Sequence, residues 1–284
     1  MDNYLFVLFQ YLVPKKLISD LIGFFAKSEN YYIKTFFIKN FQKAYDVNLK
    51  EAVQADVTLY SSFNSFFTRP LKPESRPIDK NIKSVVSPAD GVISQIGNIN
   101  SGKIIQAKGV YFNFLSFIGN NKEYIGKFKE GSFSTIYLSP KDYHRVHIPI
   151  DGKLSQMVYI PGKLFSVNKI TTRTVKNLYS INERLVCFFD TVLGPMLVVL
   201  VGAMIVSGIS VKWEKENCFN QEKIQKFVYS SIGKDSVFLK KGEEIGRFML
   251  GSTVVICFGK NKVNWSNNVS INSKVKMGQP IGTF

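Results

Sequence analysis

Cysteine and histidine are scarce in this chain of 284 residues. The three cysteines, Cys187, Cys218 and Cys257, are too few and too scattered for a disulfide framework. None of them belongs to a Cys-x-x-Cys pair, so a zinc ribbon is excluded as well, and free thiols suit a reducing compartment. The only two histidines are His144 and His147. Any chemistry that needs an imidazole must therefore take place at these two positions.

Long apolar runs are also few. The stretch over residues 4–13 is too short to cross a bilayer, and positive charge follows it instead of preceding it, so we predict no signal peptide. Residues 191–211 are 21 positions without a charge. Gly194-Pro195, Gly202 and Ser207-Gly208 interrupt this stretch, and Val and Ile dominate between the breaks. The pattern therefore predicts two buried strands joined by a turn, and not a membrane span.

Acidic residues are in the minority. The chain has 37 Lys+Arg against 21 Asp+Glu, a formal net charge of +16. Residues 1–80 hold 11 basic against 8 acidic residues, and residues 81–284 hold 26 against 13. Such a basic surface attracts nucleic acid or the anionic face of a membrane, and the alternative is a charge that serves solubility alone. A hydrophobic share of 45% excludes a disordered chain.

The hydrophobic pattern changes near residue 80. Residues 1–65 show helical spacing, and the apolar stripes over residues 17–25 and 31–41 suit helices that lie in a membrane surface or that pack on the protein body. Residues 66–79 contain three prolines and predict an extended linker on the body. From about residue 80, short β-branched runs alternate with Gly and Pro. We therefore predict an α+β fold with a mostly antiparallel β body.

One short pattern occurs twice. Residues 239–246 and 275–282 share the order apolar-Lys-x-Gly-x-x-Ile-Gly. Each copy predicts a turn with Gly at positive φ, followed by a strand, and residues 90–93 look similar. Repeated turns of this kind are similar to those of barrel-sandwich folds, a likeness that does not define a function.

Three segments carry residues suited to nucleophilic catalysis. His144 and His147 lie three positions apart in Tyr143–Pro149, Asp90 stands in a turn after an apolar run, and Ser252 follows Gly251 at the start of another. Serine, histidine and aspartate can form a nucleophile set, although the G-x-S-x-G of α/β-hydrolases is absent. The alternatives are structural histidines with a turn aspartate, or a metal-dependent hydrolase that uses both histidines and an Asp or Glu.

Taken together, these segments resemble phosphatidylserine decarboxylase of the bacterial type. The matching pieces, in chain order, are Phe66–Lys72 with Arg76-Pro77, Ser87–Gly91, Tyr143–His147, Val201–Ala203 and Leu250–Thr253. The likeness covers nearly the full chain, and the order and separations of the pieces agree. The Leu-Gly-Ser cleavage tripeptide of the family, followed by Thr, is intact.

The resemblance implies a proenzyme that cleaves itself between Gly251 and Ser252. Ser252 attacks the Gly251 carbonyl, with His147 as the base and Asp90 orienting it, and the peptide becomes an ester. β-Elimination then releases the upstream chain and leaves dehydroalanine, which water hydrolyses to a pyruvoyl group on residue 252 with loss of ammonia. The products are a β chain, 1–251, and an α chain, 252–284, which stay together as a heterodimer, with further dimerisation left open. The pyruvoyl ketone forms a Schiff base with the substrate amine and accepts the electrons of decarboxylation. His144 is assigned to decarboxylation.

The implied reaction converts phosphatidylserine to phosphatidylethanolamine and carbon dioxide, with neither metal nor pyridoxal phosphate. The partners expected are phosphatidylserine and the lipid surface, with no nucleic acid, at the cytoplasmic face of the cell membrane. Residues 1–65 form the membrane-associating region of this scheme and 66–284 the catalytic domain. The aromatic stretch 110–118 is either a second insertion loop or part of the core. A metal-dependent hydrolase and a non-catalytic membrane or nucleic-acid binding module remain the alternatives.

Overall fold

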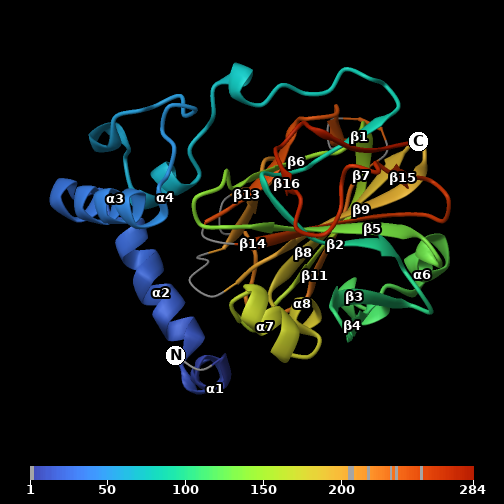
Figure 1. Ribbon diagram of the computed structural model, residues 1–284, viewed down its shortest axis with the longest axis horizontal. Helices are drawn as coiled ribbons and strands as arrows, with labels where there is room; N and C mark the ends of the chain where they lie inside the picture. Colours follow the sequence, from blue (N-terminus) through green and yellow to red (C-terminus); the bar gives the residue numbers. More distant parts are fainter. Residues whose placement is uncertain (1–2, 204–207, 216–217, 231, 234–235, 250–251) are drawn as a thin grey trace.

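The computed structural model describes residues 3–203, 208–215, 218–230, 232–233, 236–249 and 252–284. Helices at the N-terminus stand to one side of a β body (Figure 1), so the predicted α+β class is confirmed. These helices are α1 (Asn3–Leu12), α2 (Lys15–Ala26), α3 (Tyr31–Tyr45) and α4 (Phe63–Phe67), with a short 3₁₀ turn at Val57–Leu59. The division of the chain into two regions at residue 65 stays a prediction.

Local sequence signals explain where these helices begin and end. Pro14 separates α1 from α2, because the residue before a proline is disfavoured in the helical conformation. The Asn30 side chain caps α3 by accepting hydrogen bonds from two backbone N–H groups of its first turn. Phe41 of α3 packs its ring 5.2 Å from that of Phe63 in α4 and 5.7 Å from that of Phe67. Phe67 in turn lies against His144 of the body, with ring centres 4.0 Å apart, so aromatic side chains join the helices to the body.

A nine-stranded antiparallel sheet forms the centre of the body, and it does not close into a barrel within the described residues. In pairing order its strands are β11 (Gln225–Val228), β7 (Gly152–Ile160), β8 (Arg184–Thr191), β9 (Gly194–Val201), β14 (Ser252–Phe258), β5 (Ser132–Leu138), β2 (Gly91–Asn98) and β16 (Lys274–Val275), with β12 (Phe238–Leu239) beside β7. Both faces of its centre are buried. In β14, Val255 and Cys257 belong to one hydrophobic core, while Val254 and Ile256 belong to the other.

Smaller elements complete the body around this sheet. Two three-stranded sheets are made of β1 (Ser84–Val86), β17 (Pro280–Thr283) and β15 (Asn264–Trp265), and of β10 (Ile209–Val211), β13 (Glu244–Phe248) and β6 (Arg145–His147). The remaining elements are the hairpin of β3 (Lys103–Ala107) and β4 (Val110–Asn113), and the helices α5 (Phe114–Phe117), α6 (Lys122–Phe128), α7 (Lys169–Thr174) and α8 (Leu178–Ile181). The sheet that contains β6 brings both histidines close to β13, which precedes the Ser252 strand.

The uncharged stretch 191–211 forms strands, as predicted. It contains all of β9 and ends with β10, and residues 204–207 of the connection lie outside the described part. In the described residues, no helix has the length and apolar character that crossing a membrane requires. The aromatic stretch 110–118 is mostly core, because Phe112, Phe114 and Phe117 are buried.

The segment predicted as an extended linker is only partly extended. Phe66 and Phe67 end helix α4, and Pro73–Ser75 form a 3₁₀ turn. The prolines of this segment predict an extended chain. Phe66 and Phe67 are helical instead, because burial of their aromatic rings favours the last turn of α4. The rest of the segment runs along the body to β1 (Figure 1).

Both copies of the repeated pattern adopt the predicted turn. Gly242 has a φ of +84° and Gly278 a φ of +86°, and the strands β13 and β17 follow them. The two turns face the same side chain. A Cβ atom at either glycine would lie 2.8 Å from atoms of Ile78, and at Gly278 it would also lie 2.7 Å from the Pro77 carbonyl oxygen. The extended segment is therefore held between two glycine turns.

We predict that Gly278→Ala destabilises the protein more than Gly102→Ala. Both glycines have positive φ, which costs a residue with a Cβ about 1–2 kcal/mol, but nothing lies within 4 Å of a Cβ at Gly102. The clash at Gly278 adds about 1–3 kcal/mol to the loss. Urea unfolding of both variants measures the difference. Equal losses would show that the turn does not depend on its contact with Ile78.

Candidate functional site

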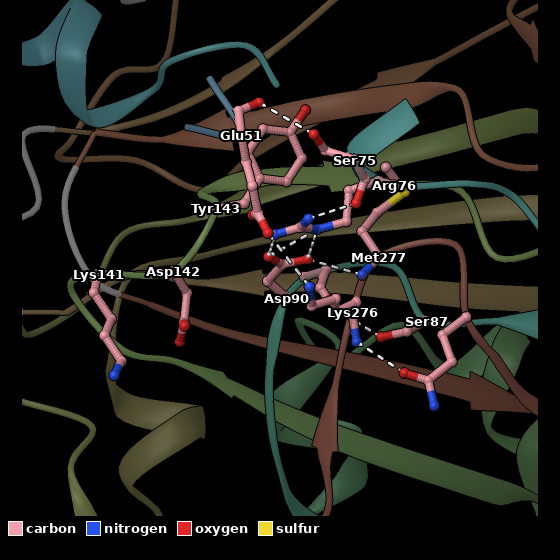
Figure 2. A network of polar contacts seen from close by, with 12 residues as sticks. Glu51, Ser75, Arg76, Ser87, Asp90, Lys141, Asp142, Tyr143, Lys276 and Met277 are labelled. Carbon is pink, nitrogen blue, oxygen red and sulfur yellow. Dashed lines mark hydrogen bonds and ion pairs between the residues drawn. The ribbon is translucent and has the colours of Figure 1, made fainter. Parts of the chain in front are cut away.

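Asp90 lies in a buried ion pair at the start of β2. Arg76 donates from Nε to both carboxylate oxygens, at 2.8 and 3.0 Å, and from Nη2 to Oδ2 (Figure 2). The backbone N–H of Met277 donates to Asp90 at 2.9 Å. Arg76 also bonds Glu51 at 2.8 Å. These carboxylates, together with hydrogen bonds, raise the Arg76 pKa although burial opposes this, so the guanidinium stays charged and holds Asp90.

His147 is held in one tautomer by its two partners. Its Nδ1 lies 2.7 Å from the carbonyl oxygen of Gly242, which can only accept, so Nδ1 carries the proton. Nε2 then accepts from the Tyr143 hydroxyl at 3.1 Å. Burial lowers the pKa of His147, while the Gly242 carbonyl and the charges of Glu244 and Asp90 act in the opposite direction. His147 is therefore neutral near pH 7, with a basic nitrogen at Nε2.

His144 is fully buried beside an aromatic ring. Its Nδ1 donates to the Asp142 carbonyl at 2.8 Å, and its ring centre lies 4.0 Å from that of Phe67. Within the described residues Nε2 has no hydrogen-bond partner. Burial lowers the pKa of His144 to about 3, and the charge of Arg69 acts in the same direction. His144 thus presents an unprotonated, unpaired nitrogen.

Ser252 opens the central strand β14. It pairs with Leu138 of β5, and its neighbour Thr253 pairs with Val201 of β9. Ser252 is fully buried, and its hydroxyl has no hydrogen-bond partner in the described part of the chain. The other half of the predicted cleavage site, Gly251, lies outside the described residues.

The fold brings the four predicted residues into one region without joining them all by contacts. The backbone N–H of His147 donates to the Pro88 carbonyl at 2.8 Å, two residues before Asp90. Phe248 donates to the His144 carbonyl at 3.1 Å, four residues before Ser252. The Asp90 carboxylate, however, is bound by Arg76 and Met277, and the Gly242 carbonyl occupies Nδ1 of His147. The assignment of Asp90 as the residue that orients His147 stays a prediction.

Two cavities flank this region. The smaller, about 310 Å³, is lined by Asp90, Tyr143, Ser139 and Arg69, among others. The larger, about 990 Å³, lies between helix α2 and the body. Glu183 is one of its lining residues, and the Glu183 carbonyl accepts a hydrogen bond from the Gly202 N–H. Gly202 directly follows β9, the strand that pairs with Thr253. The smaller cavity adjoins the candidate site, because Asp90 and the tyrosine bonded to His147 line it.

Sequence reasoning assigned no role to the residues that hold the predicted ones. Arg76, Tyr143 and the turns at Gly242 and Met277 position Asp90 and His147. One signal was available for the arginine. The chain has only six arginines among its 37 basic residues, and Arg76 stands next to a proline in the extended segment. In a chain that uses lysine for general charge, a rare arginine indicates a geometric role.

Polar residues that could hold a metal do not gather here. In the part of the chain that the structure describes, no group of three or more His, Cys, Asp or Glu is placed to bind an ion. The Nδ1 atoms of both histidines donate to backbone carbonyls. The buried Ser252 at the start of a central strand and the two buried histidines are residue types that suit a side-chain nucleophile, and this role of Ser252 stays a prediction.

Comparisons with known proteins show the family of this chain. A family profile described as phosphatidylserine decarboxylase matches residues 63–283, and one described as PSD matches residues 5–46. The phosphatidylserine decarboxylase proenzyme of Pseudomonas putida (strain W619) is 46% identical over 279 residues, covering 98% of this chain and 97% of the relative. That of Pseudomonas fluorescens (strain SBW25) is 45% identical over 281 residues, covering 99% and 98%. The chain belongs to the phosphatidylserine decarboxylase family.

We predict that Arg76→Gln lowers the free energy of unfolding by about 3–5 kcal/mol, because it leaves the buried Asp90 carboxylate without its counterion. Arg173→Gln is the matched control, since Arg173 is exposed on α7, and such surface changes stay within about 0.5 kcal/mol. Urea unfolding at pH 7 compares the two variants. Similar small losses in both would contradict the importance of the Arg76–Asp90 pair.

Proposed function

We propose that this chain is the proenzyme of a pyruvoyl-dependent phosphatidylserine decarboxylase that cleaves itself between Gly251 and Ser252. The observation that carries the proposal is the Ser252 hydroxyl, which is buried at the start of β14 and has no hydrogen-bond partner among the described residues. A buried hydroxyl normally finds a partner, since leaving it unpaired costs about 1–3 kcal/mol. Ser134 is in the same state, so what distinguishes Ser252 is its place directly after Gly251, where a free hydroxyl can attack the preceding carbonyl. The curated relatives carry the word proenzyme in their names.

The residues at this site fit a pyruvoyl group on residue 252. An unpaired serine hydroxyl at the predicted cleavage point is the precursor that such a group requires. Once formed, the pyruvoyl ketone supplies the electron sink that decarboxylation of an amino acid needs. Both strands that flank Ser252 are buried, so water has little access to the reacting atoms. A dry site strengthens the electrostatic interactions within it.

His147 is suited to the role of base in self-cleavage. The Gly242 carbonyl keeps the ring proton on Nδ1, so Nε2 has the lone pair that can accept a proton from the Ser252 hydroxyl. The lowered pKa keeps this nitrogen unprotonated at neutral pH. The Tyr143 hydroxyl occupies Nε2 in the described state. For His147 to act as the base, the Tyr143 hydroxyl has to rotate away from Nε2 or relay the proton of Ser252 to it.

His144 is suited to a later step. Its low pKa means that the free ring carries no proton on Nε2, so it must first receive one before it can act as a proton donor. The ring is fully buried against Phe67 and cannot exchange freely with solvent. The substrate ammonium must lose a proton before its amine can form a Schiff base. Nε2 of His144 can accept that proton and return it to the carbon that loses carbon dioxide, which completes the decarboxylation.

The N-terminal helices support docking at a lipid surface. Large apolar side chains along α1, α2 and α3 are exposed, for instance Leu12 at 75%, Phe24 at 72% and Tyr32 at 81%. Helices of this kind lie in a membrane interface when basic residues accompany the apolar ones, and the net charge of +16 favours anionic lipid. The large cavity beside α2 has Lys15 and Lys163 in its wall. We propose that the protein binds the membrane peripherally, at its cytoplasmic face.

We predict that Ser252→Ala leaves the chain intact at 284 residues and without decarboxylase activity, because the attacking hydroxyl is gone. Ser134→Ala is the matched control: Ser134 of β5 is also fully buried with an unpaired hydroxyl, but stands away from the cleavage point. It should mature into chains 1–251 and 252–284. Intact mass spectrometry gives the chain masses. Cleavage after residue 251 in Ser252→Ala would overturn the proposed function.

The two histidines should separate the two steps. We expect His147→Ala to slow cleavage by about 10²–10⁴-fold, the usual cost of losing a positioned general base. His144→Ala should mature into two chains but release little carbon dioxide from labelled phosphatidylserine. Gel analysis and the carbon dioxide assay are run on the same samples. Normal maturation of His147→Ala would transfer the role of base away from it, and normal turnover by His144→Ala would remove His144 from decarboxylation.

Membrane docking should depend on the exposed side chains of α2. We expect the double variant Leu21→Asp/Phe24→Asp to bind phosphatidylglycerol vesicles at least tenfold more weakly than the parent. Ile82→Asp is the control, because Ile82 is 84% exposed but lies in the segment that leads to β1. Co-sedimentation measures the bound fraction. If the control weakens binding as much as the double variant does, the helices are not the docking surface.

A further inference from the structure

Arg69 is a buried cation that has no counterion at hydrogen-bond distance among the residues that the structure describes. It follows the end of α4 and is only 3% exposed. Its Nη2 donates to the Lys141 carbonyl at 3.0 Å, but Nε and Nη1 have no partner within the described residues. A guanidinium carries five N–H donors, and burying its charge costs several kcal/mol unless an anion compensates it.

The carboxylates near Arg69 are bound to other groups. Asp90 accepts from Arg76 and from the Met277 N–H. Asp142 accepts from the backbone N–H and the hydroxyl of Ser139, at 2.7 and 2.8 Å. Figure 2 shows Lys141 and Asp142 to one side of the Arg76–Asp90 pair. Burial lowers the pKa of Arg69, the charge of Arg76 acts in the same direction, and Tyr60, Asp90 and Asp142 only partly offset this. The position of Arg69 therefore calls for an anion from outside the chain.

A cavity is available for that anion beside the reaction site. Arg69 lines the pocket of about 310 Å³, together with Lys141, Lys274 and Tyr143. Tyr143 holds His147, and the charge of Arg69 acts on the neighbouring His144.

One wall residue of the cavity also adjoins the strand partner of Ser252. Ser139, which is part of its wall, directly follows Leu138, the strand partner of Ser252. An anion bound to Arg69 would thus lie next to the residues that the proposed reaction uses.

The wall of this cavity has an excess of unpaired positive charge. Its carboxylates are Asp46, Glu51, Asp90 and Asp142. Glu51 and Asp90 are paired with Arg76 and Lys276. The cations outside these pairs are Arg69, Lys141 and Lys274, and the carboxylates outside them are Asp46 and Asp142. An anionic ligand, and not a cation, matches this balance.

We propose that Arg69 binds the phosphodiester of the phosphatidylserine headgroup and thereby directs the serine amine toward residue 252. This inference rests on the proposed function. A planar guanidinium with two free nitrogens matches two phosphate oxygens. The substrate carboxylate is the poorer partner. It leaves as carbon dioxide, so a guanidinium bound to it would stabilise the ground state more than the transition state. The phosphodiester keeps its charge throughout the reaction.

Binding to the uncleaved chain tests the inference without any turnover. Isothermal titration of Ser252→Ala protein with glycerophosphoserine should show binding, and adding Arg69→Gln should weaken it at least tenfold, the usual loss for a hydrogen bond to a charged group. L-serine, which lacks the phosphate, should bind weakly and equally to both proteins. Adding Arg173→Gln instead should change nothing. Equal affinity for glycerophosphoserine with and without Arg69 would overturn the inference.

A second arm distinguishes the headgroup from free phosphate. Inorganic phosphate should compete with glycerophosphoserine but bind more weakly, since it lacks the serine portion. If inorganic phosphate binds as tightly as glycerophosphoserine, the site recognises free phosphate and the headgroup assignment is wrong. Because the titrations need no pyruvoyl group, their outcome is independent of whether the chain cleaves itself. Failure of self-cleavage in the parent chain would count against the proposed function alone.

The mature enzyme provides the kinetic readout. Arg69→Lys keeps the charge but loses the two-pronged geometry, so it should cleave normally and raise KM for phosphatidylserine about tenfold with a much smaller change in kcat. A fall in kcat at unchanged KM would contradict a phosphate-binding role. If Arg69→Gln does not fold, the titrations are made with Arg69→Lys on the Ser252→Ala background, and undiminished affinity there would again overturn the inference.

Discussion

The buried ion pair between Arg76 and Asp90 joins three parts of the chain that are distant in sequence. Arg76 belongs to the extended segment, Asp90 begins β2, and the Met277 N–H that completes the carboxylate's partners comes from the C-terminal turn. Each group is buried, so neither can exchange its partner for water at low cost. The position of Asp90, the course of the extended segment and the placement of the last 33 residues therefore depend on one another.

The same contacts bear on how two cleaved chains would remain one protein. Ser252 begins β14, which lies between β9 and β5 in the middle of the nine-stranded sheet. The α chain of the proposed enzyme thus supplies a central strand, whose side chains belong to both hydrophobic cores. Release of the α chain would expose both cores and break four strand ladders, those of β14 with β5 and β9, of β16 with β2 and of β17 with β1. Cleavage of the backbone therefore need not separate the pieces.

The repeated glycine turns have a chemical consequence beyond their shape. The carbonyl of Gly242, in the first turn, fixes the proton on Nδ1 of His147. The N–H of Met277, next to Gly278 in the second turn, binds Asp90. Both turns pack on Ile78. One apolar side chain therefore positions the two backbone groups that bind the predicted catalytic residues. A polar site is thereby positioned by backbone groups, which have no side-chain freedom to lose.

The sequence by itself determined the class of fold, because helical and β-branched spacing separate residues 1–65 from the body, and the positive-φ turns, because only glycine adopts them freely. It also identified the family, since Asp90, His144, His147 and Ser252 occur in an ordered set of segments. Only the tertiary structure decided what these residues contact. Arg76 binds the Asp90 carboxylate, and the Gly242 carbonyl accepts a hydrogen bond from the His147 ring. A buried charge or N–H group needs a partner, because leaving it unpaired costs free energy. These partners come from segments far along the chain, which only the tertiary structure brings together.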